Sequence, residues 1–315
     1  MMREKYQRIA ESTRTGRMLT EAFSSGEGGQ SYLLASRDTL LCECLAEIAA
    51  VSENGGGDRL RRRIAGGMCG DVRVFGREGF RVEDADEVIT LCRLAPGELK
   101  RRVFILELTD CSDAAQNKLL KTLEDAPERS VFFVTAPSAK SVLPTIASRL
   151  EILYPDAPDV ASAFADVSGE NMPYALYGGR GDLTDFDALL SGAATDGLIR
   201  AIKLAGMLGP SARMLEAAGT LGTSREQMRD VLMRFENIMG DVIRCHGGMM
   251  PETYGLFNIR SLAEKFPLAA MPDVLGSVRA AVARTASGNL AAVADMFVIT
   301  VSEVMYNAKS SGRQI

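Results

Sequence analysis

The chain has 315 residues, of which 46% are hydrophobic and 24% charged, an ordinary balance for a folded protein with two or three domains. Its net charge of −5 excludes a global attraction to nucleic acid, so any DNA contact would have to be local or made through partners. The sequence has no uninterrupted run of about 18 apolar residues and no apolar core of a signal peptide near its start. We therefore expect a cytoplasmic protein without a membrane span.

The first elements along the chain are an amphipathic helix over residues 3–23 and a glycine-rich loop at Gly26–Gly29. A phosphate-binding loop follows a buried strand, opens a helix and ends in Gly-Lys-Ser/Thr. Here the glycines precede the strand expected over 31–34, and no lysine follows them. The cluster is therefore interpreted as a flexible linker.

The segment directly after that strand is where a phosphate loop would belong. It reads Ala35-Ser36-Arg37-Asp38-Thr39 and leads into a helix predicted over 40–51. It offers neither a glycine to curl around a phosphate nor a lysine to neutralise its oxygens. Asp38 can cap the helix, which would put a carboxylate where a phosphate would otherwise sit. We expect no nucleotide cofactor here.

A short basic helix containing Arg59–Arg63 follows, then a strand over 71–75 and a helix over 82–94. The arginine run is interpreted as a solvated face, and a surface for DNA or a partner is the alternative. The six cysteines include no C-x-x-C pair, so we expect free thiols and no metal. The single histidine, His246, is interpreted as a helix-end residue rather than a catalyst.

The stretch from 101 to 150 contains a strand, a helix and a second strand. The strands are predicted at 103–106 and 130–135 from their β-rich apolar runs. The helix between them should be capped by Asp113, with Gln116 completing a capping box, and should turn Leu119, Leu120 and Leu123 inward. Two strands joined by a helix indicate the right-handed crossover of an α/β fold with a parallel sheet.

Three motifs in this stretch resemble the bacterial DNA polymerase III clamp-loader AAA+ family. They are Val-Phe-Ile-Leu-Glu at 103–107, Ala-Gln-Asn-Lys-Leu-Leu-Lys-Thr-Leu-Glu at 115–124 and Pro-Thr-Ile-Ala-Ser-Arg at 144–149. The resemblance implies a RecA-like parallel sheet domain, then a small helical lid and an all-α collar. In ATP-hydrolysing members the central strand ends in Asp-Glu, whereas this chain has Glu107 and Leu108. Because leucine cannot orient water, no intrinsic ATPase is expected.

The same resemblance implies a role for Ser148 and Arg149. In clamp loaders this turn projects an arginine toward the ATP of the neighbouring subunit, where it stabilises charge on the γ-phosphate. Arg149 is thus the candidate catalytic arginine finger in trans, with Ser148 beside it. The alternative is a surface arginine that caps a strand. The family's usual cysteine is replaced by Leu150, which is expected to be a packing position.

The rest of the chain is predicted to be helical. We expect an AAA+ domain over 1–155, a helical lid over 156–194 after Pro155 and Pro158, and a collar over 195–315. Apolar spacing predicts an antiparallel helix pair whose inward residues are Ala201, Leu204, Leu208 and Leu215, and further helices over 228–245, 272–285 and 290–306. The tail at 309–315 is expected to be disordered.

Within the family the resemblance is to the delta-prime type, a non-hydrolysing member of the ring. It implies partners of the gamma/tau and delta types, and the sliding clamp and primed DNA reached through the complex. Two alternatives stay open. An active gamma-type ATPase would need Gly-Lys-Ser/Thr after Leu34 and an acid at position 108. The other alternative is a scaffold or DNA-binding adaptor outside the clamp loader, and the acidic charge balance disfavours direct DNA binding.

Overall fold

The computed structural model describes residues 2–109, 111–165, 167–209 and 213–311. The chain divides into two compact units. The first comprises Met1–Asp166 and the short segment Arg180–Thr184, and the second comprises Val167–Gly179 and Asp185–Ile315. The predicted three-part division at residues 155 and 194 stays a prediction.

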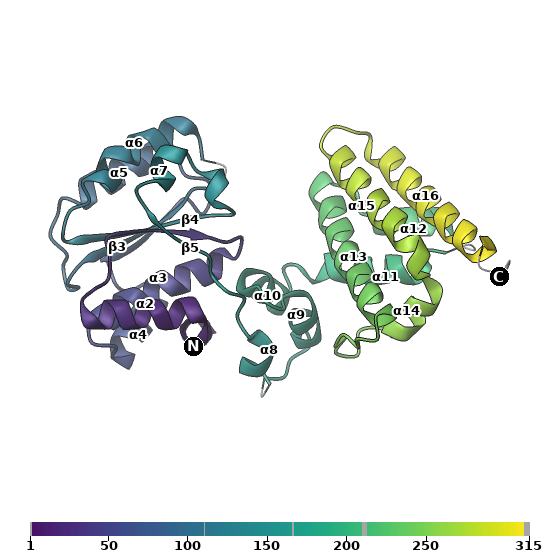
Figure 1. Ribbon diagram of the computed structural model, residues 1–315, viewed down its shortest axis with the longest axis horizontal. Coiled ribbons are helices and arrows are strands. Elements are labelled where there is room, and N and C mark those ends of the chain that lie inside the picture. The colour runs from purple at the N-terminus through teal and green to yellow at the C-terminus, as the bar shows by residue number, and fades with distance from the viewer. Residues whose placement is uncertain (1, 110, 166, 210–212, 312–315) are drawn as a thin grey trace. The chain divides into compact units, whose positions relative to one another are not determined.

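The first unit is built on a five-stranded sheet with the order β2-β3-β4-β1-β5, in which every neighbouring pair is parallel (Figure 1). The strands are β1 (Ser31–Ala35), β2 (Val72–Phe75), β3 (Arg102–Glu107), β4 (Ser130–Ala136) and β5 (Glu151–Leu153). The predicted α/β class is confirmed, and so is the crossover, because β3 pairs with β4 from Arg102 opposite Ser130 to Glu107 opposite Thr135. β5 was not predicted, since three residues are too few for a periodic signal.

Helices cover both faces of this sheet. Figure 1 shows α2, α3 and α4 on one face and α5, α6 and α7 on the other. The helical segments of the first unit are α1 (Met2–Ser12), α2 (Arg14–Ser25), α3 (Thr39–Glu53), α4 (Asp58–Ala65), α5 (Val82–Leu91), α6 (Asp113–Glu124), the 3₁₀ turn Ala139–Ser141, α7 (Pro144–Ala147) and α8 (Val160–Ala163). Adjacent residues of β4 serve opposite faces: Phe132 stacks on Phe104 and Phe133 stacks on Tyr32, each with ring centroids 5.1 Å apart.

The predicted single helix over 3–23 is wrong, because the chain breaks at Thr13 and forms two helices. The Thr13 backbone is extended, and its hydroxyl accepts a hydrogen bond from the Gly16 amide at 2.9 Å, which caps α2. A Cβ on Gly16 would lie 2.0 Å from the Ala10 carbonyl oxygen, so glycine permits the close approach of the two helices. The apolar pattern runs through this break, which is why periodicity alone did not reveal it.

The predicted cap of α6 is also wrong by one residue. Ser112, not Asp113, is the N-cap, and its hydroxyl accepts from the Ala115 amide at 3.3 Å. Gln116 forms no capping box; it donates to the Cys111 carbonyl at 3.3 Å and accepts from the Leu143 amide at 2.8 Å. Leu119 and Leu123 are buried as predicted, while Leu120 is partly buried.

The second unit is helical, as predicted for the C-terminal part of the chain. Its helices are α9 (Met172–Gly178), α10 (Leu183–Leu190, whose first two residues belong to the first unit), α11 (Thr195–Met207), α12 (Met214–Thr220), α13 (Arg225–His246), α14 (Ile259–Lys265), the 3₁₀ turn Leu268–Ala270, α15 (Met271–Thr285) and α16 (Leu290–Ser311). The stripe on α13 is buried from Val231 to Val242, and Phe235 packs edge-on against Phe266 and Phe297. The short helix α14 was not predicted.

Two expectations for this unit need correction. Leu215 was predicted to face inward, but its side chain is 86% exposed, because the short helix α12 buries Ala217 and Thr220 instead. The tail predicted from residue 309 is helical through Ser311 as part of α16, and residues 312–315 lie outside the described residues.

Among the described helices, the segment Leu290–Ala308 of α16 is long and apolar enough to cross a membrane, judged by length and composition alone. Its mean hydropathy is 1.3. Phe297, Val298 and Val301 of this segment are buried in the helical bundle. A core helix can have the same length and apolar composition.

Candidate functional site

The carboxyl ends of β1, β3 and β4 meet at one edge of the sheet. The strand register places Thr135 opposite both Leu34 and Glu107, and Ala35 opposite Ala136. In open parallel sheets, ligands bind at this edge. The segment that follows β1 at this edge comprises residues 36–39, where the sequence analysis found no phosphate-binding loop.

Asp38 is buried at this edge, and its carboxylate is engaged by four donors. Oδ1 accepts from the Leu41 amide at 2.9 Å, which confirms the predicted cap of α3. The same oxygen accepts from the amide and the hydroxyl of Thr184 at 3.1 and 2.9 Å, and Oδ2 accepts from the Leu183 amide at 2.6 Å. Asp38 thereby ties the start of α3 to Leu183 and Thr184, which belong to the same unit.

Backbone amides around Asp38 are engaged as well. The amides of Asp38, Thr39 and Leu40 donate, respectively, to Ser36 Oγ at 3.1 Å, the Arg37 carbonyl at 3.0 Å and Thr184 Oγ1 at 2.9 Å. A phosphate bound at a helix N-terminus uses amides of this kind. At this helix they already have acceptors within the protein.

Glu107, the neighbouring acidic residue at this edge, is influenced by the charges of Glu43 and Arg77. Burial raises the pKa of Glu107; the charge of Glu43 adds to this increase, and Arg77 opposes it. Arg77 donates to both oxygens of Glu43, at 2.9 and 2.8 Å. Leu108, the next residue after Glu107, is 1% exposed and belongs to the hydrophobic core, so its position offers no group that could activate water.

The described residues contain no group of three His, Cys, Asp or Glu side chains that could hold a metal ion. The six cysteines are free thiols, four of them buried. Burial raises the pKa of the Cys69 thiol to about 11 and that of Cys42 higher still, which keeps both protonated at neutral pH. His246 is the last residue of α13, and its Nε2 lies 2.8 Å from the Phe266 carbonyl oxygen.

Ser148 and Arg149 lie together in the turn between α7 and β5. Both are exposed, whereas Ile146 and Leu150 on either side are buried in the core. Arg149 Nη1 donates to the Thr145 carbonyl at 2.6 Å, and Ser148 Oγ donates to the same carbonyl at 3.2 Å. The turn is therefore anchored on both sides and presents its polar groups to solvent, and Leu150 is the packing residue expected.

Arg149 also has an acidic partner that sequence analysis did not find. Its Nη2 lies 3.3 Å from Glu124 Oε2, and the two side chains are 31% and 55% exposed. Glu124 is the last residue of α6 and of the second family motif, so the motif contained the residue without indicating the contact. Thr184 was missed for a different reason, because it lies 146 residues from Asp38 and no local pattern links them.

Two of the four arginines in the basic run of α4 pair with glutamates, and the other two are exposed to solvent. Arg61 is buried and donates to Glu11 at 2.8 Å, and Arg63 pairs with Glu98. Arg59 and Arg62 are exposed, in agreement with a solvated face. A role of this face toward DNA or a partner stays a prediction.

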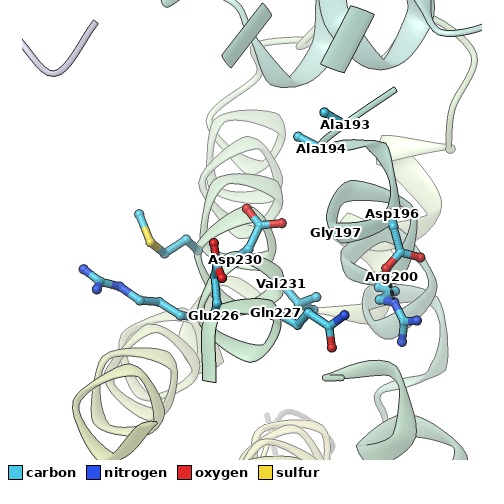
Figure 2. Close-up of a pocket in the computed structure, with 11 residues that line it drawn as sticks. Ala193, Ala194, Asp196, Gly197, Arg200, Glu226, Gln227, Asp230 and Val231 are labelled. Carbon is cyan, nitrogen blue, oxygen red and sulfur yellow. Dashed lines mark hydrogen bonds and ion pairs between the residues drawn. The ribbon is translucent and has the colours of Figure 1, made fainter. Parts of the chain in front are cut away.

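Figure 2 shows a groove in the second unit between α11 and α13, with a volume of about 560 Å³. Charges of both signs line it. Arg200 donates to Asp196 at 2.6 Å, and Asp230 accepts from Arg234 at 2.9 Å. The predicted site residues Ser148 and Arg149 do not line this groove.

Comparisons with known proteins bear on the first unit. Residues 11–155 match the family model described as "DNA polymerase III, delta subunit", over a little under half of the chain. A DNA polymerase III gamma-subunit-related protein of Thermotoga maritima is similar in structure, with a TM-score of 0.48 and 13% identity over 97% of this chain and 100% of that one. The clamp loader delta protein of Bacillus subtilis has a TM-score of 0.36 and 11% identity over 90% and 98%. No curated protein matches the sequence significantly.

Because both TM-scores are low, the likeness to a known family depends on the match to residues 11–155. That segment includes all five strands, the Asp38 edge and the Ser148-Arg149 turn. Through it, this part of the chain is similar to the family of DNA polymerase III delta subunits.

Proposed function

We propose that the chain is a delta-prime-type clamp-loader subunit that does not hydrolyse ATP and supplies Arg149 to the ATP of a neighbouring subunit. It would act in the cytoplasm as one member of a ring with gamma/tau-type and delta subunits. The complex would place the sliding clamp on primed DNA. The chain would contribute a rigid partner surface and one guanidinium to this reaction.

The observation that carries the proposal is the environment of Asp38. Its carboxylate accepts from Leu41, Leu183 and Thr184, and so uses donors that would otherwise be available to a phosphate. A phosphate brought to the same helix terminus would meet a buried negative charge at short range, which opposes its binding. Leu108 adds a second, independent loss, because a leucine cannot orient the attacking water.

The proposed role of Arg149 is supported by its exposure and its anchoring. A guanidinium that acts in trans has to project from the surface of its own subunit while its backbone stays fixed. Ile146 and Leu150 are buried on either side of exposed Ser148 and Arg149. Arginine suits the task because its planar fork binds phosphate oxygens in a fixed geometry and stays charged.

The decisive experiment uses the reconstituted complex with gamma/tau-type and delta subunits. Arg149→Ala should assemble normally and lose the part of the DNA-stimulated ATP turnover that comes from the one site it serves, because an arginine finger contributes on the order of 10³ or more at its own ATP while other sites continue to work. Arg129→Ala removes another exposed arginine and serves as the matched control. Unchanged turnover with Arg149→Ala would make the residue a surface arginine only.

Two further outcomes separate the alternatives. Failure of the chain to co-purify with gamma/tau-type and delta subunits would favour an adaptor outside the clamp loader. Hydrolysis of ATP by the isolated chain would favour a gamma-type subunit.

A further inference from the structure

The arginine proposed as the finger is folded back onto its own subunit. Its Nη1 bonds to the Thr145 carbonyl at 2.6 Å, and its Nη2 faces Glu124 Oε2 at 3.3 Å. The acceptor in the first contact is a neutral carbonyl, and the acceptor in the second is a negatively charged carboxylate. The guanidinium that would have to reach a neighbour's phosphate is thus engaged by a carboxylate in the free chain.

The strength of this contact suits a reversible restraint. Both side chains are substantially exposed, and ion pairs between exposed groups are weak because water and salt screen them. A triphosphate presents more negative charge than one carboxylate, and it also offers oxygens to the arginine fork. The neighbour's nucleotide can therefore displace Glu124, whereas the subunit alone keeps the pair.

The places of Glu124 and Arg149 in the fold also favour a reversible restraint. Glu124 ends α6, whose buried Leu119 and Leu123 fix the helix against the sheet. Arg149 follows α7, and α6 and α7 are in contact. The pair therefore joins two elements that are already packed together, so its main consequence is the direction of the guanidinium rather than the assembly of the fold.

We propose that Glu124 is a positioning residue that holds Arg149 back until the ATP of a neighbouring subunit takes the guanidinium. The inference rests on the proposed function of Arg149 in trans. Glu124 makes no contact with nucleotide in this account and acts through Arg149. Its effect is to lower ATP turnover as long as the neighbour's ATP is not brought within reach of the guanidinium, which in this account happens when the ring engages DNA and clamp.

The first test measures ATP turnover of the reconstituted loader with and without DNA. Glu124→Gln removes the charge and keeps the shape, so it should raise turnover in the absence of DNA about threefold or more. Glu128→Gln, the same exchange at an exposed glutamate nearby, should leave it unchanged. Combined with Arg149→Ala, Glu124→Gln should have no further effect, because its action requires the arginine.

These outcomes distinguish the inference from the function on which it rests. If Arg149→Ala lowers turnover but Glu124→Gln leaves it unchanged or lowers it, the restraint is refuted and the finger stands. If Glu124→Gln raises turnover equally in the Arg149→Ala background, the restraint is also refuted. If Arg149→Ala has no effect on turnover, both proposals fall.

A second measurement needs no partner. In the isolated full chain with ¹⁵N-labelled arginine, the side-chain signal of Arg149, assigned by its loss in Arg149→Lys, should shift on Glu124→Gln and stay in place on Glu128→Gln. High salt should move the wild-type signal toward that of the Glu124→Gln chain. A signal that is insensitive to both changes would show that Glu124 does not hold the guanidinium in solution.

Discussion

Two polar regions of the first unit are built in opposite ways. At the Asp38 edge a buried carboxylate is held by Leu41, Leu183 and Thr184, two of them far away along the chain. At the Arg149 turn an exposed guanidinium has one neutral and one charged partner, both nearby in space and weakly shielded from water. The first region is closed by its own residues, and the second can exchange its partners.

This contrast separates stability from activity. Removing a group from the closed region should destabilise the fold, because buried donors lose their acceptor. Removing the exposed guanidinium should leave stability intact and, under the proposed function, change only what the subunit does to a neighbour. The changes in stability can be measured by urea unfolding of the isolated chain, with hydrogen exchange to locate the effect, and the change in activity by ATP turnover of the reconstituted complex.

The largest effect is expected for Asp38→Ala. It leaves the amides of Leu41, Leu183 and Thr184 without their acceptor, and the free energy of unfolding should fall by about 3 kcal/mol. Exchange of the Leu183 and Thr184 amides should accelerate most. A loss below about 0.5 kcal/mol, typical of ordinary surface substitutions, would show that Asp38 does not tie α3 to Leu183 and Thr184.

Asp71 is a second buried carboxylate of the first unit, and the effect of replacing it on the free energy of unfolding can be compared with that of replacing Asp38. It accepts from the amides of Gly97, Glu98 and Leu99 at 2.9, 2.7 and 3.1 Å, and it pairs with Arg102 at 3.2 Å. Burial opposes its ionisation, but these donors outweigh burial and hold the pKa below the ordinary value. Asp71→Asn should cost about 2 kcal/mol at neutral pH.

The sign of the pH dependence follows from that lowered pKa. The stability contributed by ionised Asp71 is present above its unfolded-state pKa of 3.8 and is lost as the pH falls through the lower folded-state value. Asp71→Asn should therefore flatten the acid side of the stability profile. An unchanged acid slope in the variant would contradict the assignment.

A smaller effect is expected for Thr184→Val, which removes only the hydroxyl. That hydroxyl donates to Asp38 at 2.9 Å and accepts from the Leu40 amide at 2.9 Å. The loss should be about 1 kcal/mol, because the amides of Leu41, Leu183 and Thr184 keep their bonds to Asp38 and only the Leu40 amide loses its acceptor. Thr90→Val, a matched exchange at an exposed helical threonine, should be nearly neutral. If Thr184→Val lowers the free energy of unfolding as little as Thr90→Val does, the Thr184 hydroxyl does not help to hold the Asp38 cluster together.

The smallest change in stability is expected for Arg149→Ala. Its exposed ion pair with Glu124 contributes little, so the free energy of unfolding should change by less than about 0.5 kcal/mol. Under the proposed function, the same variant should still lower the DNA-stimulated ATP turnover of the complex. A strong destabilisation would instead assign Arg149 a structural role.

Local signals explain what could be predicted from the sequence. The cap at Asp38 acts on an amide three residues away, and the strands at 103–106 and 130–135 stand out by composition. Motif order led to the Ser148-Arg149 turn. Each of these features depends on neighbours along the chain, which is the range over which pattern analysis works.

Contacts between distant segments explain the failures. Gln116 was assigned to a cap, but in the fold it reaches Leu143, which lies 27 residues on. Leu215 fits an apolar spacing, yet the packing of α12 leaves it exposed. Asp38 was identified as a cap, whereas its bonds to Leu183 and Thr184, which close the edge, require the fold itself. Contacts that a side chain makes with residues far away in the sequence leave no pattern among its neighbours along the chain.

Nucleotide binding by the isolated chain tests the central claim most directly. Isothermal titration with magnesium and ATP should show no saturable heat up to millimolar nucleotide, because the Asp38 carboxylate and the bonded amides leave a triphosphate no site at the end of β1. Saturable binding with a micromolar Kd would contradict the account, since the Asp38 edge would then have to open for a ligand that we propose it excludes.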